Sequence, residues 1–232
     1  MSKLIGLISA WEDFQKNHAQ AGVEEFCIYY LAKSRNTKKD TDLLGGYATP
    51  DLDTTLGKLI GRIAGFIQLY SRIAFQEHEK EIDLNWMYFL NAIYHREEAN
   101  KTDIINYNFT EQSTGNEIIA RLKKLGLVTE RVDPNDRRAR LVKVTSKGEK
   151  KLVEFWSKTY KAMVVVFSEM TEDDKKLVIQ LLNNTEVKHT LLFSQIKHKN
   201  INEILELTIG KTQAKKLVSE GTKRIKKFQG NE

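Results

Sequence analysis

The hydrophobic pattern of the chain changes its period at Gly126, and this change constrains the fold more than any other feature. Before Gly126, apolar side chains recur every three or four residues, as they do on one face of a helix. After it, residues 127–132 and 140–145 alternate as strands do, and the turn formers Asp133-Pro-Asn-Asp136 separate them. The pattern therefore predicts one β-hairpin in a largely helical chain.

The remainder of the chain favours helices, because its 232 residues include only 2 prolines and 13 glycines. Apolar residues at helical spacing predict long helices at 54–78, 148–170 and 172–198, and shorter ones at 83–95, 100–107, 111–125 and 202–208. Residues 3–36 predict two further helices broken near Gly22, and the polar segment 36–53 predicts a linker. The expected fold class is mainly α with a small β-hairpin.

Several helix ends carry recognisable signals. Asp83 is expected to be an N-cap, and Thr171 with Asp174 three residues later resembles a capping box. Gly126 is expected to end the helix at 111–125 in the left-handed conformation. Along 54–78, the glycine repeat at Gly57, Gly61 and Gly65 predicts close packing between helices through small side chains.

Charge is concentrated rather than spread evenly. The formal net charge is +6, but the segment from Arg121 to Lys151 alone carries 11 Lys and Arg against 4 Asp and Glu. Such a segment favours a partner that displays phosphates. A second basic stretch, from Lys211 to Lys227, carries 7 cations and one acid, Glu220. It could form an extra helix on the dimer or touch DNA, and the preferred interpretation is a solvated cationic face.

Composition also limits the compartment and the chemistry. With one cysteine, Cys27, no intramolecular disulfide can form, and this agrees with the reducing cytoplasm. There is no signal-peptide pattern and no apolar run long enough to span a membrane, so a cytoplasmic location is expected. The histidines lack metal-ligand spacing, and no nucleophile elbow or phosphate-binding glycine loop occurs. We therefore expect neither an enzyme nor a cofactor.

The order helix, turn, helix, hairpin predicts a winged helix-turn-helix unit. In such a unit the second helix presents its polar face to the major groove of DNA, where base edges are distinguishable. The exposed face expected here consists of Ser113, Thr114, Asn116, Glu117 and Arg121. The hairpin tip carries Arg137, Arg138 and Arg140, and arginine is favoured in the negative potential of a narrow minor groove.

These segments resemble the MarR family of bacterial regulators. The resemblance is carried by Arg121-Leu-Lys-Lys-Leu-Gly-Leu-Val-Thr-Glu-Arg131 and by the wing, in which Asp136, Arg138, Val144, Thr145 and Gly148 match the family in order and spacing. It covers about residues 52–197. It implies a homodimer in which the first and last long helices of two subunits interdigitate. It also implies that Arg138 enters the minor groove while Asp136 holds it through an ion pair, with Arg137 and Arg140 as phosphate contacts or helpers of Arg138.

The resemblance further implies a domain plan and a ligand. Residues 51–80 and 148–198 would form the helical dimerisation base, and 81–147 the winged helix-turn-helix domain. Residues 1–50 and 199–232 would be extensions, which we expect to enlarge the dimer interface. A small-molecule effector would bind near Tyr70, Phe75, Trp86 and Phe89, although aromatic residues at this spacing more often belong to a core.

Alternatives remain open at three points. Glu117 stands where the family often has arginine; it either accepts a hydrogen bond from a cytosine amino group or pairs with Arg121 one turn on. Cys27 is either a redox sensor or, the preferred interpretation, a buried inert thiol. The preferred function is a sequence-specific transcription regulator, acting as a repressor on an inverted repeat of double-stranded DNA. The alternative is a nonspecific DNA-binding or protein-interaction module on the same fold.

Overall fold

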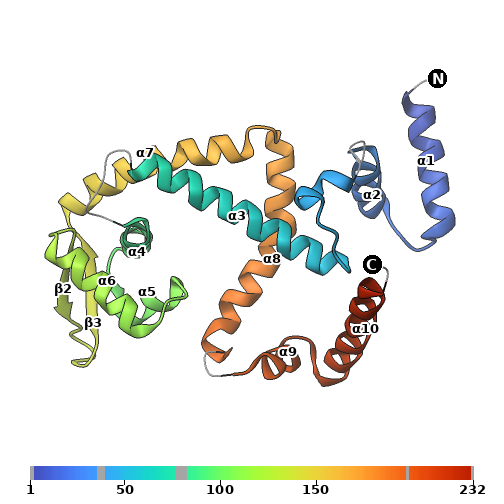
Figure 1. Cartoon of the computed structure of the whole chain (residues 1–232). Coiled ribbons are helices and arrows are strands. Elements are labelled where there is room, and N and C mark those ends of the chain that lie inside the picture. The colour runs from blue at the N-terminus through green and yellow to red at the C-terminus, as the bar shows by residue number, and fades with distance from the viewer. Residues whose placement is uncertain (1–2, 36–39, 77–82, 197–198, 231–232) are drawn as a thin grey trace. The chain divides into compact units, whose positions relative to one another are not determined.

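The computed structural model describes residues 3–35, 40–76, 83–196 and 199–230, and Figure 1 shows the elements that they form. The chain divides into two compact units, Met1–Lys58 and Leu59–Glu232, and each is described by itself. The long helix α3 (Leu52–Gln76) crosses the division. The predicted helix ends at 77–78 and 197–198, and residues 36–39 of the predicted linker, lie outside the described residues.

The first unit begins with a pair of helices, α1 (Lys3–Asn17) and α2 (Val23–Arg35), with the break near Gly22 that the sequence predicts. Phe14 and Phe26 are buried between the helices, and the ring of Trp11 meets that of Phe26 edge-on with centroids 5.0 Å apart. Cys27 is exposed, so the expectation of a buried thiol was wrong. It follows the buried Phe26 by one position on α2, and successive helical residues point in different directions. The linker contains a 3₁₀ segment, η1 (Asp40–Gly46).

The second unit is centred on the predicted winged domain. Its elements are α4 (Leu84–Tyr94), β1 (Ala99–Asn100), α5 (Lys101–Tyr107), α6 (Gln112–Lys124), β2 (Val128–Val132) and β3 (Arg140–Val144). Each of the helices and both of the strands predicted for this domain occur, within two residues of their expected limits. Met87, Leu90, Ile119 and Leu122 are fully buried and hold α4 and α6 together in one core.

The sheet has one strand more than predicted. Its order is β1-β3-β2, all antiparallel, with Val128 opposite Val144 and Val132 opposite Arg140 in the hairpin. The added strand β1 pairs Ala99 with Val142. Because it is only two residues long, it leaves no alternating pattern in the sequence.

Four helices follow the hairpin: α7 (Ser146–Phe167), α8 (Glu172–Ile196), α9 (Ile201–Ile209) and α10 (Lys211–Gln229). The Thr171–Asp174 signal is confirmed, since the Asp174 amide donates to the Thr171 hydroxyl at 3.2 Å. The family glycine, Gly148, has a clear steric reason. A Cβ there would lie 2.2 Å from the carbonyl oxygen of Leu127, so only glycine lets α7 begin this close to the sheet.

The glycine repeat of α3 behaves differently from the prediction. A Cβ built on Gly57, Gly61 or Gly65 meets no atom within 4 Å, so the described part of the chain packs nothing against this stripe.

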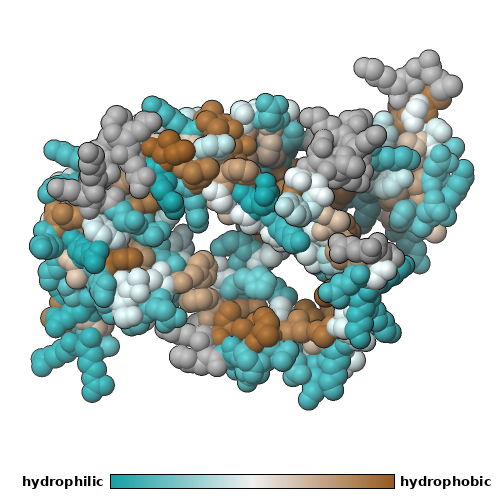
Figure 2. All heavy atoms as spheres, in the orientation of Figure 1, coloured by the Kyte–Doolittle hydropathy of each residue, from teal (hydrophilic) through white to brown (hydrophobic). Residues whose placement is uncertain are grey.

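The C-terminal end of α3 is in contact with α7, where Phe75 is buried and its ring meets Phe155 edge-on, with ring centroids 5.9 Å apart. Apolar side chains also gather on the surface over α7 and over the α9–α10 segment (Figure 2).

Candidate nucleic-acid interface

Helix α6 is two-sided, as a helix that enters a DNA groove must be. Ile118, Ile119 and Leu122 are buried against the core. On the opposite side Ser113, Thr114, Glu117 and Arg121 are exposed, and Asn116 is half-buried. The structure thus places the five predicted residues of α6 on its accessible side, with Asn116 nearest the core.

A close approach of α5 and α6 sets the angle of this helix. Gly115 is buried, and a Cβ on it would lie 2.5 Å from Cγ1 of Ile105 on α5. Ile105 is itself fully buried in the core. Gly115 is therefore a positioning residue for the interface. Sequence reasoning passed over it, because a glycine inside a helical pattern is a weak signal by itself.

Arg121 and Glu117 do not pair with each other among the described residues. The guanidinium of Arg121 instead lies over the ring of Trp86, 5.2 Å from its centroid. A cation held over an aromatic face keeps its charge while its position is restricted. The carboxylate of Glu117, one turn earlier, is exposed and makes no hydrogen bond or ion pair with the part of the chain described.

The wing turn is built on two aspartates. Asp133 Oδ1 accepts from the Asn135 amide at 2.8 Å, and Asp136 Oδ1 accepts from the Arg138 amide at 2.9 Å. Asp136 thus supports Arg138 through its backbone, as short polar side chains do in turns. Within the described residues no ion pair joins the two side chains, so the expected Asp136–Arg138 ion pair stays a prediction for the DNA-bound form.

The arginines at the wing are exposed and unpaired in the described chain. Arg137 and Arg138 belong to the turn, and Arg140 begins β3 opposite Val132. Neighbouring cations, in contrast, are engaged in ion pairs. Arg131 binds Glu98 through two hydrogen bonds of 2.7 and 2.5 Å, and this bidentate pair ties β2 to the segment before β1.

A second ion-pair group lies on the hairpin strand β2. Glu130 Oε2 accepts from Lys123 at 3.0 Å, and Oε1 lies 3.5 Å from Lys101. The hydrogen bond from Lys123, together with the charge of Lys101, lowers the pKa of the Glu130 carboxyl. For Glu98 the hydrogen bond from Arg131 lowers the pKa in the same way. Both carboxylates are thus ionised at neutral pH and hold the hairpin to α5, α6 and β1.

A hollow of about 360 Å³ joins the wing to α6. It brings together four of the predicted residues, namely Asn116, Asp136, Arg138 and Arg140, whereas Ser113, Thr114, Glu117, Arg121 and Arg137 lie outside it. Asn100, Lys101 and Thr102 also line it, and the prediction missed them. Asn100 is the N-cap of α5 and accepts from the Thr102 amide at 2.8 Å. A capping asparagine before a basic residue was the available signal.

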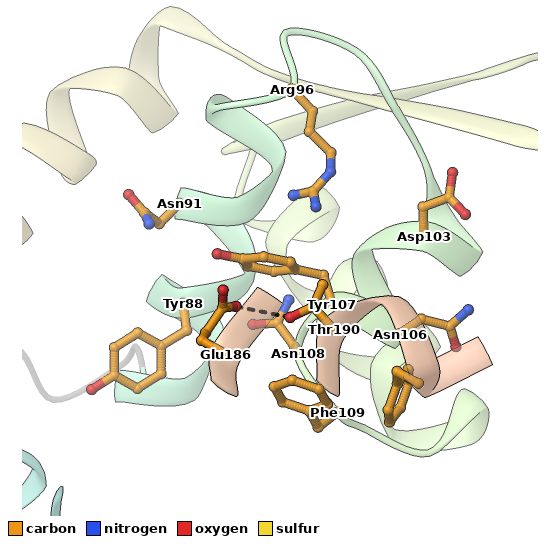
Figure 3. Close-up of a pocket in the computed structure, with 11 residues that line it drawn as sticks. Tyr88, Asn91, Arg96, Asp103, Asn106, Tyr107, Asn108, Phe109, Glu186 and Thr190 are labelled. Atoms are coloured by element: carbon orange, nitrogen blue, oxygen red, sulfur yellow. Dashed lines mark hydrogen bonds between the residues drawn. The ribbon is translucent and has the colours of Figure 1, made fainter. Parts of the chain in front are cut away.

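A larger cavity, of about 560 Å³, is lined by residues of α4, α5 and α8 (Figure 3). Tyr88, Arg96 and Phe109 line it from the winged domain, and Glu186, Thr190 and Phe193 line it from α8. Arg96 lies over the ring of Tyr107, 4.3 Å from its centroid, and burial raises the pKa of the Tyr88 hydroxyl.

Three of the predicted effector residues, Phe75, Trp86 and Phe89, belong to other surroundings. Phe75 and Phe89 are buried in the core, and Trp86 packs against that core and Arg121. Neither phenylalanine therefore lines this cavity. The core alternative that the spacing left open applies to both.

The winged domain matches a known protein family. Residues 81–139, from just before α4 to the wing turn, match the family model described as the MarR family. The winged domain belongs to the MarR family. No curated protein matches the sequence. Along the described residues, no helix is both long and apolar enough to cross a membrane.

Solved structures of transcription regulators share the fold of this MarR-family domain and its adjoining helices. A SlyA-like regulator from Listeria monocytogenes is 19% identical with a TM-score of 0.53, and the match covers 61% of this chain and 93% of that chain. A MarR-family regulator from Silicibacter pomeroyi is 21% identical with a TM-score of 0.51, covering 58% and 90%. The regulator SlyA is 16% identical with a TM-score of 0.52, covering 61% and 98%. These likenesses establish the fold.

Proposed function

We propose that this chain is a sequence-specific DNA-binding transcription regulator that acts as a homodimer on an inverted repeat. One observation carries the proposal: an accessible polar face on α6 and three unpaired wing arginines belong to the same described winged unit, which matches the MarR family. A helix reads base edges in the major groove, and arginines beside it fit the adjacent minor groove and phosphates. Bound over a promoter, such a dimer represses by blocking the polymerase.

The residues of α6 and of the wing suit different parts of the duplex. Asn116 suits adenine, and Glu117, which has no partner in the described chain, suits a cytosine amino group. Ser113 and Thr114, both exposed, suit a phosphate or a thymine methyl group. Arg138 is the minor-groove residue, and Arg137 and Arg140 are phosphate contacts.

The homodimer is supported by apolar surface that the described chain leaves uncovered. Helix α8 has 25 residues, and no described side chain on it is buried. Even its apolar side chains are exposed, for example Ile179 at 66% and Leu191 at 69%. An apolar hollow of about 370 Å³ at the α7–α8 corner is lined by Tyr160, Val164 and Ile179, among others. Exposed apolar side chains that gather around such a hollow are typical of a protein interface.

The second copy explains the unpacked stripe on α3 as well. Gly57, Gly61 and Gly65 lie open, beside exposed Ile60 and Phe66. Small residues let another helix approach closely, and a second copy supplies one. In this arrangement residues 51–80 and 148–198 form the dimerisation region and 81–147 the DNA-binding domain. Residues 1–50 and 199–232 are extensions.

A small-molecule effector is the second element of the proposal. The cavity in Figure 3 has the volume of a ligand site and combines aromatic walls with a few polar groups. Residues from α5 and from α8 face it together. A ligand bound there would touch both the helix-turn-helix and the helix assigned to the dimer, and so would change the spacing of the two recognition helices.

Selection from random duplexes tests the proposal. The purified protein is incubated with a pool of random double-stranded DNA at about physiological salt, and the bound fraction is sequenced. An enriched inverted repeat is expected for the wild type and for the remote control Lys176→Ala, which removes an exposed cation on α8. Arg138→Ala should lose the enrichment, at a cost of about 1–3 kcal/mol if the arginine contacts one base.

The charge-preserving variant Arg138→Lys separates recognition from attraction, because lysine keeps the charge without the planar fork. It should bind DNA but select less sharply. Retention of DNA by the wild type without any enriched sequence would favour the nonspecific module. Absence of binding even at low salt would favour the protein-interaction module.

A further inference from the structure

Helix α10 carries a charge that the MarR-family domain does not explain. Its 19 residues include six lysines, one arginine and a single acid, Glu220, a net charge of +6 that equals the formal charge of the whole chain. The family match ends at residue 139, so this helix lies well outside it. A regulator that keeps such a helix concentrates positive charge at a second place besides the wing.

The cations of α10 are arranged on one side of the helix. At 3.6 residues per turn, Lys215 and Lys226 fall in one row and Lys216 and Lys223 in a second row about a quarter turn away. Small polar residues, Thr212 and Ser219, lie between the rows. The helix is about 28 Å long, so the rows run along several base-pair steps of a duplex.

The opposite side of α10 is apolar, and part of it packs against the protein. Ala214 is buried, whereas the large apolar side chains on the same side are 36–53% exposed, namely Leu217, Val218, Ile225 and Phe228. Helix α9 packs along α10, joined to it at Gly210. Figure 2 shows hydrophobic and hydrophilic side chains on separate sides of this segment. Packing against α9 thus covers only part of the apolar side, and the basic side is exposed.

None of these cations is neutralised by the part of the chain that the structure describes. The seven basic side chains of α10 take part in no ion pair there, and Glu220 makes none with the cations one turn away. Seven like charges on 19 residues repel one another, and this repulsion weakens the isolated helix. An array of anions at regular spacing removes that cost.

We propose that the basic face of α10 binds the phosphates of duplex DNA flanking the sequence that the winged domain reads. The inference rests on the proposed function, since it extends the DNA footprint of the same regulator. DNA suits the face because the same chain carries a second group of unpaired cations, the wing arginines, which a duplex can engage together with α10. The α10 lysines bind phosphates, so they add affinity and no sequence preference.

The test is the salt dependence of DNA binding by the full-length protein. Four cations are neutralised together in the variant Lys215→Gln, Lys216→Gln, Lys223→Gln, Lys226→Gln, in which glutamine keeps a helix propensity close to that of lysine. The probe is a duplex of about 40 base pairs that contains a selected sequence at its centre. The slope of log K against log salt should fall by about one for each phosphate that α10 no longer neutralises, and affinity at low salt should fall by about tenfold or more. The matched control replaces the same four lysines by arginine and should retain the slope.

Three outcomes separate this inference from the proposed function. If the glutamine variant keeps the wild-type slope and affinity while selection of an inverted repeat persists, the α10 inference is overturned and the proposed function stands. If Arg138→Ala and the glutamine variant both leave binding unchanged, both proposals are overturned. If the wild type co-sediments with phosphatidylglycerol–phosphatidylcholine vesicles, and the glutamine variant loses only that binding, the partner of α10 is a membrane surface and the inference is wrong.

Discussion

The ring of Phe109 packs edge-on against the ring of Phe193, with centroids 5.0 Å apart and an angle of 80° between their planes. Phe109 belongs to the turn between α5 and α6, and Phe193 belongs to α8. This ring pair therefore joins the helix-turn-helix to the long helix assigned to the dimer. Phe109 has a φ of +50°, in the left-handed region where glycine is the usual residue.

The Phe109 turn leads to a prediction about stability. The left-handed conformation costs a non-glycine residue about 1–2 kcal/mol, and an aromatic pair of this geometry contributes about 0.5–1.5 kcal/mol. Phe109→Gly loses the pair but relieves the strain, so its free energy of unfolding should stay within about 1 kcal/mol of the wild type. Phe193→Ala keeps the strain and loses the pair, so it should be the more destabilising change. Urea unfolding of both variants and of the double variant completes the cycle. A loss of about 4 kcal/mol for Phe109→Gly would contradict this, because a loss of that size is typical of truncating a buried aromatic side chain.

Gly115 gives a second prediction, because its helix approaches α5 so closely. Gly115→Ala inserts a Cβ into Ile105, and overpacking of this kind costs about 1–3 kcal/mol. The matched control is Gly221→Ala on α10, where a Cβ meets nothing within 4 Å and alanine should stabilise the helix by up to about 1 kcal/mol. Thermal unfolding distinguishes the two. Equal effects at both positions would show that the close approach to Ile105 does not set the position of α6.

The wing turn makes a third prediction that separates two roles of Asp136. If Asp136 acts through the Arg138 amide, Asp136→Asn retains the acceptor oxygen and should bind DNA as well as the wild type or better, since a negative charge near phosphates is removed. Asp136→Ala loses the acceptor and should bind more weakly. Titration of a fluorescent duplex measures both. A loss as large for asparagine as for alanine would instead support an ion pair with the Arg138 side chain.

The ion pairs at the hairpin give a prediction for pH. Hydrogen bonds from Arg131 and Lys123 lower the pKa of the Glu98 and Glu130 carboxyls below their ordinary value of 4.5. A carboxyl whose pKa is lowered by folding contributes stability that is present above the ordinary pKa and is lost as the pH falls through the folded value. The urea midpoint should therefore change little through these groups between about pH 6 and 8 and should fall below about pH 4.5. The variant Glu98→Gln should be less stable at about pH 7 and should lose less on acidification, and an unchanged acid branch in that variant would exclude Glu98 as a contributor.

The sequence was sufficient for most elements because their signals are local. The capping residues Asp83 and Thr171, the left-handed Gly126 and the alternation around the wing turn each depend on a few neighbouring residues. The strand β1 was missed because two residues show no period. The roles of Gly115 and Trp86 were missed because each depends on a residue distant in sequence, Ile105 or Arg121, that only the fold brings near. Four of the five predicted α6 residues are exposed and Asn116 is half-buried, but their contact with DNA stays a prediction, and the residues that support them were not predicted.

The exposed apolar side of α8 supplies the last prediction, on assembly. Ile179 is exposed in the single chain and lines the hollow at the α7–α8 corner, where a second copy would cover it. Ile179→Glu places a charge in that interface, and burial of an unpaired charge costs several kcal/mol, enough to shift a dimer toward monomers. Gln180→Glu adds the same charge one residue further along, about a quarter turn away, and should leave the dimer intact.

Light scattering coupled to gel filtration reads the mass of each variant directly. The wild type and Gln180→Glu should elute at twice the mass of one chain, and Ile179→Glu at the mass of one chain at low protein concentration. DNA binding should weaken together with the dimer, because a monomer engages one half-site and loses the gain in effective concentration that links the two. A dimeric Ile179→Glu protein would exclude the α7–α8 corner from the interface. A monomeric wild type would exclude the two-fold arrangement altogether, and the selected DNA would then contain single half-sites without an inverted repeat.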